Sequence, residues 1–154
     1  MKAIPSEFLA VDWEDEPLEF IVDNIGYTEI RKSDIHGKGL FALKNFYQGE
    51  VLCWLNGQVI DWRSYNEILA TNPYGKQNVF FKEWNALSIN TLLVRPFRTK
   101  YSFINHGTTP NLIIQYDPIR VVALQQILPG DELILDYRCE PLSNEYKKRS
   151  HYLR

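Results

Sequence analysis

Short stretches of alternating apolar and polar residues dominate the first half of the chain, and turns containing glycine separate them. Tyr27–Lys32 alternates as a half-buried strand does, and the two glycines of Asp34–Gly39 allow a tight connection to the apolar stretch Leu40–Leu43. Glu50–Leu55 continues the pattern and ends at the turn signal Asn56-Gly57. This half of the chain is therefore predicted to consist mainly of small β elements.

One helix is predicted in the middle of the chain. Asp61 can cap its N-terminus, and the helix should continue to about Ala70, because Tyr65 and Leu69 then lie on one face. The dipeptide Asn72-Pro73 would end it.

The next segment carries a weaker pattern. Two strands are predicted over Val79–Phe81 and Ala86–Ile89, with a turn near Trp84. We interpret Thr91–Lys100 as an irregular connection, because Pro96 and several basic residues interrupt any regular period.

The C-terminal third returns to short apolar runs. Leu112–Tyr116 and Ile119–Leu124 are predicted to form a hairpin around Asp117-Pro118, and Leu133–Tyr137 is predicted to be the last strand. The polar stretch Asn144–Tyr152 can form a short helix. Many short strands with few helices indicate a mostly β domain.

Composition fits one compact domain. The chain has 154 residues, of which 45% are hydrophobic and 14% aromatic, enough for a single good core. Its net charge of −2 gives no positive field for binding phosphates, so nucleic acid is not expected as a direct partner. We predict an acidic N-terminal flank over residues 1–26, the domain itself over 27–138 and a basic C-terminal flank over 139–154.

Charge is distributed unevenly between these segments. Residues 1–25 contain seven acidic side chains and one basic one, which leaves 16 basic and 12 acidic residues in the rest of the chain. The acidic arm is interpreted as a solvated leader, with attraction of a lysine-rich substrate as the alternative.

Cysteine and histidine are sparse. Cys53 and Cys139 have no spacing typical of a zinc site or a disulfide framework, and three histidines do not suggest a metal centre. No apolar run is long enough to span a membrane, and the N-terminus lacks a secretion signal. A soluble intracellular protein with reduced thiols and no membrane partner is expected, without distinction between nucleus and cytoplasm.

Three motifs follow one another in the chain: HGKGLFALKNFYQGE over His36–Glu50, FINHGTTPN over Phe103–Asn111 and GDELILDY over Gly130–Tyr137. In this order they resemble the SET domain of protein lysine methyltransferases. The resemblance implies a fold of small curved sheets, in which the asparagine-histidine segment and the final tyrosine strand meet in a knot-like crossing. It also implies that cofactor and lysine approach from opposite faces and meet through a narrow channel.

The same resemblance implies a cofactor site. S-adenosylmethionine would be bound by Gly37, Lys38, Gly39, Phe103, Asn105 and His106. Gly37–Gly39 would offer backbone groups to the methionine part, since glycine permits close approach. The Asn105 amide would contact the amino-acid end, backbone groups of His106 the adenine, and Phe103 would pack nearby.

The implied catalytic residue is Tyr137. Its hydroxyl would lie near the transferred methyl group and orient the incoming lysine amine, whose unperturbed pKa of about 10.4 must fall before attack. Leu55, Leu135 and Tyr137 would line the lysine channel, where desolvation lowers that pKa. Holding the reacting atoms in line provides catalysis by orientation.

The sequence also differs from the family pattern. Ser102 replaces a common arginine, Gly107-Thr108 a serine-cysteine pair, and Trp54-Leu55 a glutamate-tyrosine pair. Leu135 replaces an aromatic residue that influences the number of methyl groups added. Because leucine is smaller, addition of two or three methyl groups is predicted.

The expected substrate is a lysine in an extended segment of another protein, with a histone tail as one candidate. Two alternatives stay open: a catalytically weak module that binds protein tails or cofactor, and methylation of a small-molecule amine or another side chain. The zinc-binding segments that flank many family members are absent, so the C-terminal flank with Tyr146 is predicted to close the site. The pattern does not predict the oligomeric state.

Overall fold

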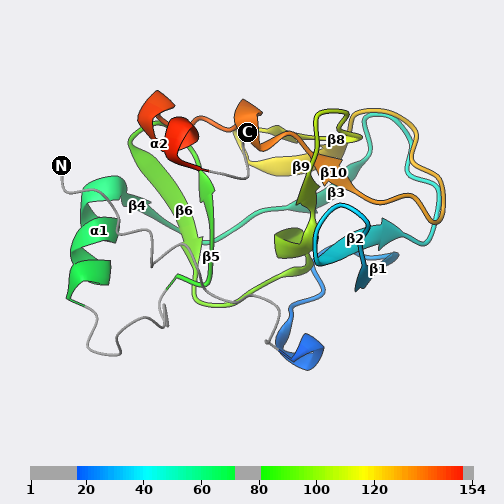
Figure 1. Cartoon of the computed structure of the whole chain (residues 1–154), viewed down its shortest axis with the longest axis horizontal. Helices are drawn as coiled ribbons and strands as arrows, with labels where there is room; N and C mark the ends of the chain where they lie inside the picture. The colour runs from blue at the N-terminus through cyan, green and yellow to red at the C-terminus, as the bar shows by residue number, and fades with distance from the viewer. Residues whose placement is uncertain (1–16, 72–80, 151–154) are drawn as a thin grey trace.

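The computed structural model of the chain describes residues 17–71 and 81–150 (Figure 1). Among these residues the strands form small sheets of two or three strands, accompanied by two α-helices and short 3-10 turns. This is the mostly β architecture predicted from the sequence.

The first sheet is the hairpin of β1 (Thr28–Lys32) and β2 (Lys38–Ala42). The two strands pair antiparallel, with Arg31 opposite Gly39. The predicted strands and their glycine-containing connection are confirmed, and β2 is buried along most of its length.

A second sheet has the order β3-β9-β8. Its strands are β3 (Val51–Trp54), β9 (Arg120–Ala123) and β8 (Leu112–Gln115), all paired antiparallel. β8 and β9 form the predicted hairpin, whose turn contains a cis peptide bond between Asp117 and Pro118.

A third sheet has the order β4-β6-β5 and packs with the helices on one side of the molecule (Figure 1). It contains β4 (Gln58–Asp61), β6 (Thr91–Arg95) and β5 (Glu83–Ala86). α1 (Trp62–Ala70) follows β4 directly, and the Asp61 carboxylate accepts a hydrogen bond from the Ser64 amide at its N-terminus. The predicted helix and its cap are confirmed.

The sequence predictions for this sheet were partly wrong. Thr91–Lys100 is not an irregular connection, because its first half forms the central strand β6. Trp84 lies within β5 and not in a turn, and β5 ends where the strand Ala86–Ile89 was predicted to begin. Strand β4 was not predicted, and most of the predicted strand Val79–Phe81 lies outside the described residues.

The last sheet joins two very short strands, β7 (Asn105–His106) and β10 (Ile134–Leu135), in parallel. The predicted strand Leu133–Tyr137 is therefore shorter than expected, since Tyr137 begins the 3-10 turn η5 (Tyr137–Cys139). A similar turn, η4 (Lys100–Phe103), leads into β7. Another, η3 (Leu18–Phe20), precedes the first sheet.

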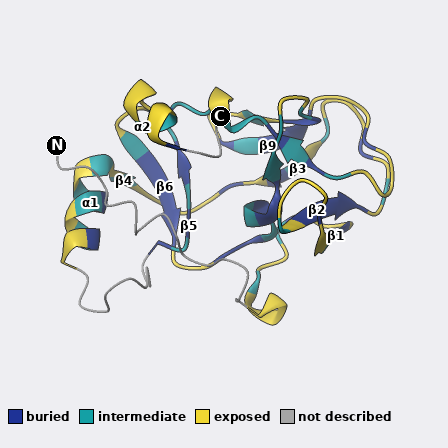
Figure 2. Cartoon of the chain, in the orientation of Figure 1, coloured by how far each residue is buried: buried dark blue, intermediate teal, exposed yellow. Residues whose placement is uncertain are grey.

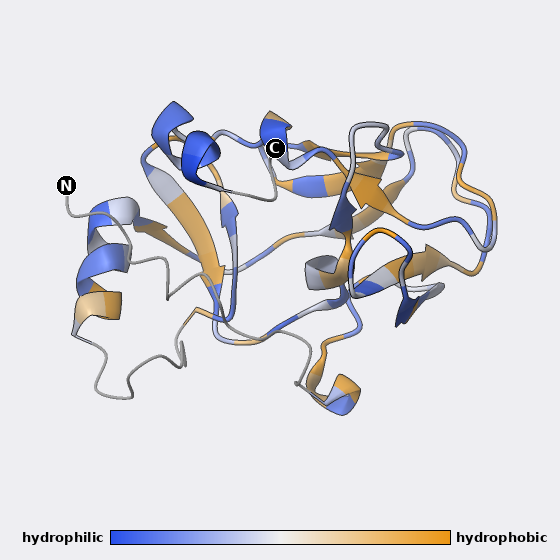
Figure 3. Cartoon of the chain, in the orientation of Figure 1, coloured by the Kyte–Doolittle hydropathy of each residue, from blue (hydrophilic) through white to orange (hydrophobic). Residues whose placement is uncertain are grey.

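Two clusters of buried side chains form the core. The larger joins the first, second and fourth sheets and includes Leu40, Val121 and Leu133. The smaller lies between α1 and the third sheet and includes Tyr65 and Leu92. Figures 2 and 3 show that the buried strands β2 and β6 are also among the apolar ones. The candidate site residues sit on the larger cluster.

Candidate active site

The connection between β1 and β2 forms one wall of the site. Gly37 adopts a φ of 47°, a conformation that favours glycine, and its carbonyl accepts a hydrogen bond from the Ser33 amide at 2.9 Å. Gly39 faces Glu132: a Cβ atom at this glycine would lie 2.8 Å from the Glu132 Cδ and 3.1 Å from the Ser33 Cβ. Lys38, between them, is exposed. Glu132 can lie this close to the backbone because Gly39 has no side chain.

Asn105 is the centre of a polar cluster against this wall. Its Nδ2 lies 2.8 Å from Glu132 Oε1, 3.1 Å from the His36 carbonyl and 3.3 Å from the Lys38 carbonyl. Ser33 Oγ donates to the same Glu132 carboxylate at 2.8 Å. The cluster thus collects more acceptor oxygens than one amide can satisfy, so it suits a group with several N–H donors.

The parallel pairing places the asparagine-histidine segment beside the C-terminal motif. Asn105 pairs with Ile134 and His106 with Leu135. Asn111 fixes this arrangement, because its Oδ1 accepts from the Ile134 amide and its Nδ2 donates to the Glu132 carbonyl, both at 2.8 Å. Among the described strands only β10 pairs with β7, so the other edge of β7 carries backbone groups with no strand partner.

The His106 side chain holds Tyr137 in place. Its Nδ1 accepts a hydrogen bond from the Tyr137 amide at 3.0 Å, which requires that the ring proton sits on Nε2 in this geometry. The two rings lie 5.3 Å apart between centroids. Asp136 Oδ1 lies 3.8 Å from the same nitrogen, but a hydrogen-bonded Arg138 guanidinium holds the pKa of this carboxyl below its usual range.

The Tyr137 hydroxyl donates a short hydrogen bond to the carbonyl of Ile104, the residue before the asparagine. Both the backbone and the hydroxyl of Tyr137 are therefore anchored to β7 or its preceding residue. Phe103, nearby, is buried with the Arg98 guanidinium carbon 4.7 Å from its ring centroid. The structure thus brings Phe103, Asn105, His106 and Tyr137 together.

The predicted channel residues also meet. Leu55 and Leu135 belong to the same buried cluster, with 7% and 3% of their surface exposed, and Tyr137 packs against that cluster. The side chains that share this cluster with Tyr137 therefore include two buried leucines of the predicted channel.

A buried polar network connects segments that lead into the site. Arg95 forms a short ion pair with Glu83, and donates to the Asn56 carbonyl at 3.0 Å. The Glu83 carboxylate also accepts from the Thr99 amide at 2.9 Å and from the Ser102 hydroxyl. The ion pair of Arg95 and Glu83 therefore connects Asn56, which follows Leu55, to the turn η4, which leads into β7.

The C-terminal helix α2 (Asn144–Arg149) packs against α1 and the third sheet. Its Tyr146 ring lies 5.9 Å from the rings of both Trp62 and Trp84, over the third sheet (Figure 1). Lys147 Nζ donates to the Arg138 carbonyl at 2.8 Å, which ties α2 to the residue after Tyr137. Closure of the site by this flank stays a prediction.

Several residues of the site were not singled out from the sequence. Ser33 and Glu132 accept hydrogen bonds from Asn105, and the Ile104 carbonyl accepts one from Tyr137. Asn111 instead accepts one from the Ile134 amide beside the site. Ile104, Asn111 and Glu132 lie inside the motifs already described, and this position was the available signal for them. Nothing in the pattern marked Ser33, whose partner Glu132 is 99 residues away.

A profile of the SET domain matches residues 37–138, about two thirds of the chain. The chain belongs to the SET domain family. Its members are typically protein lysine methyltransferases, which generally use S-adenosylmethionine.

Two relatives of this SET domain were found by sequence. The "Variant-silencing SET domain-containing protein" of Plasmodium falciparum is 27% identical over 128 residues, which is 77% of this chain and 5% of the relative. The "Histone-lysine N-methyltransferase trithorax" of Drosophila virilis is 29% identical over 122 residues, 73% of this chain and 3% of the relative. The chain thus spans only a small part of either protein. Within residues 17–71 and 81–150, no helix has the length and apolarity needed to cross a bilayer.

Proposed function

We propose that this SET domain transfers a methyl group from S-adenosylmethionine to the side-chain amine of a lysine in a protein substrate. The observation that carries the proposal is the double anchoring of Tyr137. Its amide is held by His106 and its hydroxyl by the Ile104 carbonyl, on either side of the Asn105 cluster. The tyrosine hydroxyl is thus held in a defined place beside a site rich in acceptors.

The residues around Asn105 fit the methionine end of the cofactor, which supplies an activated methyl group when bound. The His36 and Lys38 carbonyls and the Glu132 carboxylate can accept hydrogen bonds from an α-ammonium group. The absence of a side chain at Gly39 lets the Glu132 carboxylate lie directly against this backbone. We propose that Gly37, Lys38 and Gly39 contact the amino-acid end, and the free edge of β7 at His106 the adenine, with Phe103 packed nearby.

The aliphatic wall prepares the lysine for attack. Removing the ammonium from water disfavours its charged form, so the pKa of a lysine beside Leu55 and Leu135 should fall from its usual value. Tyr137 is proposed to orient the neutral amine. Its hydroxyl already donates its proton to the Ile104 carbonyl, which supports an orienting role for this group.

The substrate is proposed to be an exposed lysine in an extended protein segment. The relative from Drosophila virilis is a histone-lysine methyltransferase by name, so histone tails are the first substrates to test. The small Leu135 side chain supports addition of two or three methyl groups. A product that stops at monomethyl-lysine would contradict this part of the proposal.

The test compares the native protein with Tyr137→Phe in two assays. Calorimetry with S-adenosylmethionine measures binding, and transfer of labelled methyl groups to histones and to a cell lysate, followed by mass spectrometry, measures activity. Tyr47→Phe is the matched control, because Tyr47 is exposed and, although it lies in the first motif, it is not one of the predicted site residues. Loss of transfer in Tyr137→Phe alone, with cofactor binding retained, is the expected result.

Other results would change the assignment. Cofactor binding without transfer to any protein favours the catalytically weak binding module. Transfer only to free amines favours a small-molecule substrate. Full turnover by Tyr137→Phe would show that the tyrosine does not have the proposed role.

A further inference from the structure

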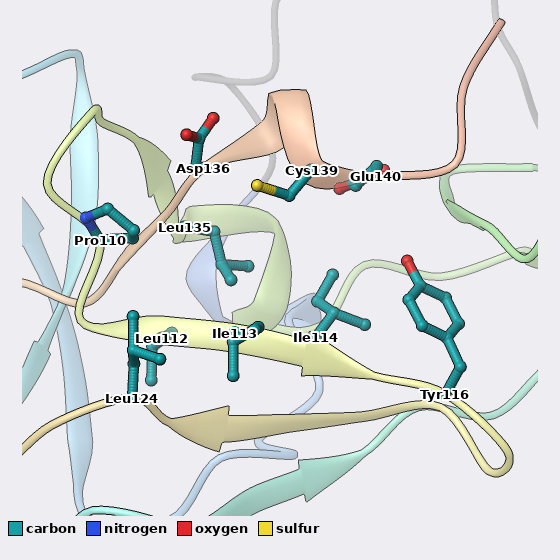
Figure 4. Close-up of a pocket in the computed structure, with 10 residues that line it drawn as sticks. All are labelled: Pro110, Leu112, Ile113, Ile114, Tyr116, Leu124, Leu135, Asp136, Cys139 and Glu140. Atoms are coloured by element: carbon teal, nitrogen blue, oxygen red, sulfur yellow. The ribbon is translucent and has the colours of Figure 1, made fainter.

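A pocket of about 220 Å³ lies beside the candidate site, between β8 and the segment that follows β10 (Figure 4). Most of its walls are apolar. Its lining consists of Pro110, Leu112, Ile113, Ile114, Tyr116, Leu124, Leu135, Asp136, Cys139 and Glu140. The pocket shares Leu135 with the candidate lysine channel, but Tyr137 does not line it.

The polar groups of the pocket are concentrated in two carboxyls and one phenol. Asp136 is already paired with Arg138, whose Nη2 lies 2.7 Å from Asp136 Oδ2. Glu140, by contrast, forms no ion pair with any described basic side chain. The one described hydrogen bond to its carboxylate is a long one, from the Tyr101 hydroxyl at 3.5 Å.

Tyr116 lies at the same end of the pocket, and Figure 4 shows its hydroxyl directed toward Glu140. Burial raises the pKa of this phenol above its usual value, and the nearby Glu140 charge adds to the effect. The hydroxyl therefore stays protonated and can donate a hydrogen bond. The pocket thus combines aliphatic walls with one carboxyl that has no ion-pair partner among the described residues, and this suits a ligand with an aliphatic stem and a cationic end.

We propose that this pocket binds the side chain of a second basic residue in the protein substrate, with its stem against Ile114 and Leu135 and its charged end at Glu140 (Figure 4). The inference rests on the proposed function, because the occupant is a neighbour of the methylated lysine. Charge complementarity supports it: a desolvated carboxylate is costly alone and is stabilised by a cation with hydrogen-bond donors.

The ionisation of Glu140 gives the binding a characteristic pH dependence. Burial raises the pKa of this carboxyl from 4.5 to about 7, while the Tyr101 hydroxyl and the Lys147 charge oppose the shift. A cation prefers the ionised form, so its affinity should rise between pH 6 and pH 8 by about tenfold, the ratio of the ionised fractions. The other titratable groups facing this end are Tyr101, Tyr116, Asp136, Cys139 and Lys147.

The direct test uses n-butylguanidinium and n-butylammonium as probes and n-butanol as the neutral counterpart. Binding is followed by NMR shifts of the folded protein at pH 6 and pH 8. Glu140→Gln keeps the shape and the contact with Tyr101, and should remove both cation preference and pH dependence. Glu145→Gln is the matched control, because Glu145 is exposed and paired with Arg149 on α2.

A second variant keeps the test decisive if Glu140→Gln is poorly folded. Lys147→Met removes the one charge that opposes the raised pKa of Glu140, so it should move the pH dependence of cation binding to higher pH. Equal binding of butanol and butylguanidinium, or a cation effect that persists in Glu140→Gln, would overturn the proposal.

A peptide arm separates this inference from the proposed function. Peptides with a target lysine and a neighbouring arginine are compared with peptides that carry citrulline instead. A several-fold loss of kcat/KM with citrulline in the native protein, absent in Glu140→Gln, is expected. Transfer that ignores the neighbour would refute the pocket assignment alone. Cation binding without transfer to any protein or peptide would count against the methyltransferase proposal, and would leave the pocket as a cation site but not as a site for a neighbour of the methylated lysine.

Discussion

The buried pair of Arg95 and Glu83 offers a quantitative test of how the site is held. These side chains have 2% and 4% of their surface exposed, and the Glu83 carboxylate also accepts from Thr99 and Ser102. Glu83→Gln preserves the shape and most acceptor contacts but leaves the Arg95 charge buried without its counter-ion. Removing one partner of such a pair costs about 3–5 kcal/mol.

The expected loss is a large part of the stability of a domain, which is about 5–15 kcal/mol in total. The melting temperature should therefore fall by about 6–20 °C, at about 2–4 °C for each kcal/mol in a chain of this size. Urea unfolding followed by tryptophan fluorescence measures the change directly, because Trp84 lies on the same strand as Glu83. The urea dependence of the free energy should stay unchanged.

Two companion variants make the result interpretable. Glu67→Gln removes an exposed helix pair with Arg63 and should leave the unfolding midpoint where it is. The double variant Glu83→Gln/Arg95→Met should recover most of the loss, because no buried charge is then left uncompensated. A single Glu83→Gln cost below about 1 kcal/mol would show that water or rearrangement satisfies Arg95, and the reasoning would be wrong.

Further outcomes follow from other contacts. Asn111→Ala should lower the free energy of unfolding by about 1–3 kcal/mol, because it leaves two backbone groups of the C-terminal motif unpaired, and urea titration measures this. Gly39→Ala should weaken S-adenosylmethionine binding in calorimetry, since its Cβ would meet the facing carboxylate. Iodoacetamide at pH 8 should label Cys139 before Cys53, because burial raises the pKa of Cys53 to about 12. The free energy of unfolding should decline as pH rises from 4.5 to about 7. In this range the unfolded chain has lost the Glu140 proton, whereas the folded protein still binds it. This decline should be absent in Glu140→Gln.

Local patterns predicted the elements whose causes are local. The hairpin of β1 and β2 follows from alternation around two glycines, and the start of α1 follows from Asp61, which caps it in the structure. Strand β6 was missed because a basic residue usually marks solvent. Here Arg95 can be buried because it forms an ion pair with Glu83 in the neighbouring strand β5.

The structure brings Phe103, Asn105, His106 and Tyr137 of the motifs together, but the motifs did not predict how these residues are held. The contact of Tyr137 with the Ile104 carbonyl and the role of His106 as an acceptor depend on the parallel pairing of β7 and β10. Such pairing joins segments far apart in sequence, and nothing in either motif alone specifies it.

The same pairing has a consequence for when the candidate site forms during folding. Two strands of two residues each cannot persist alone, so β7 and β10 should associate only after the sheets around them have folded. Contacts between distant segments also form slowly, because closure of long loops must come first. The site should therefore be among the last parts to form and among the first to open. In hydrogen exchange, the Gly107 amide, which bonds to the Leu135 carbonyl, should lose protection before the amides of β6.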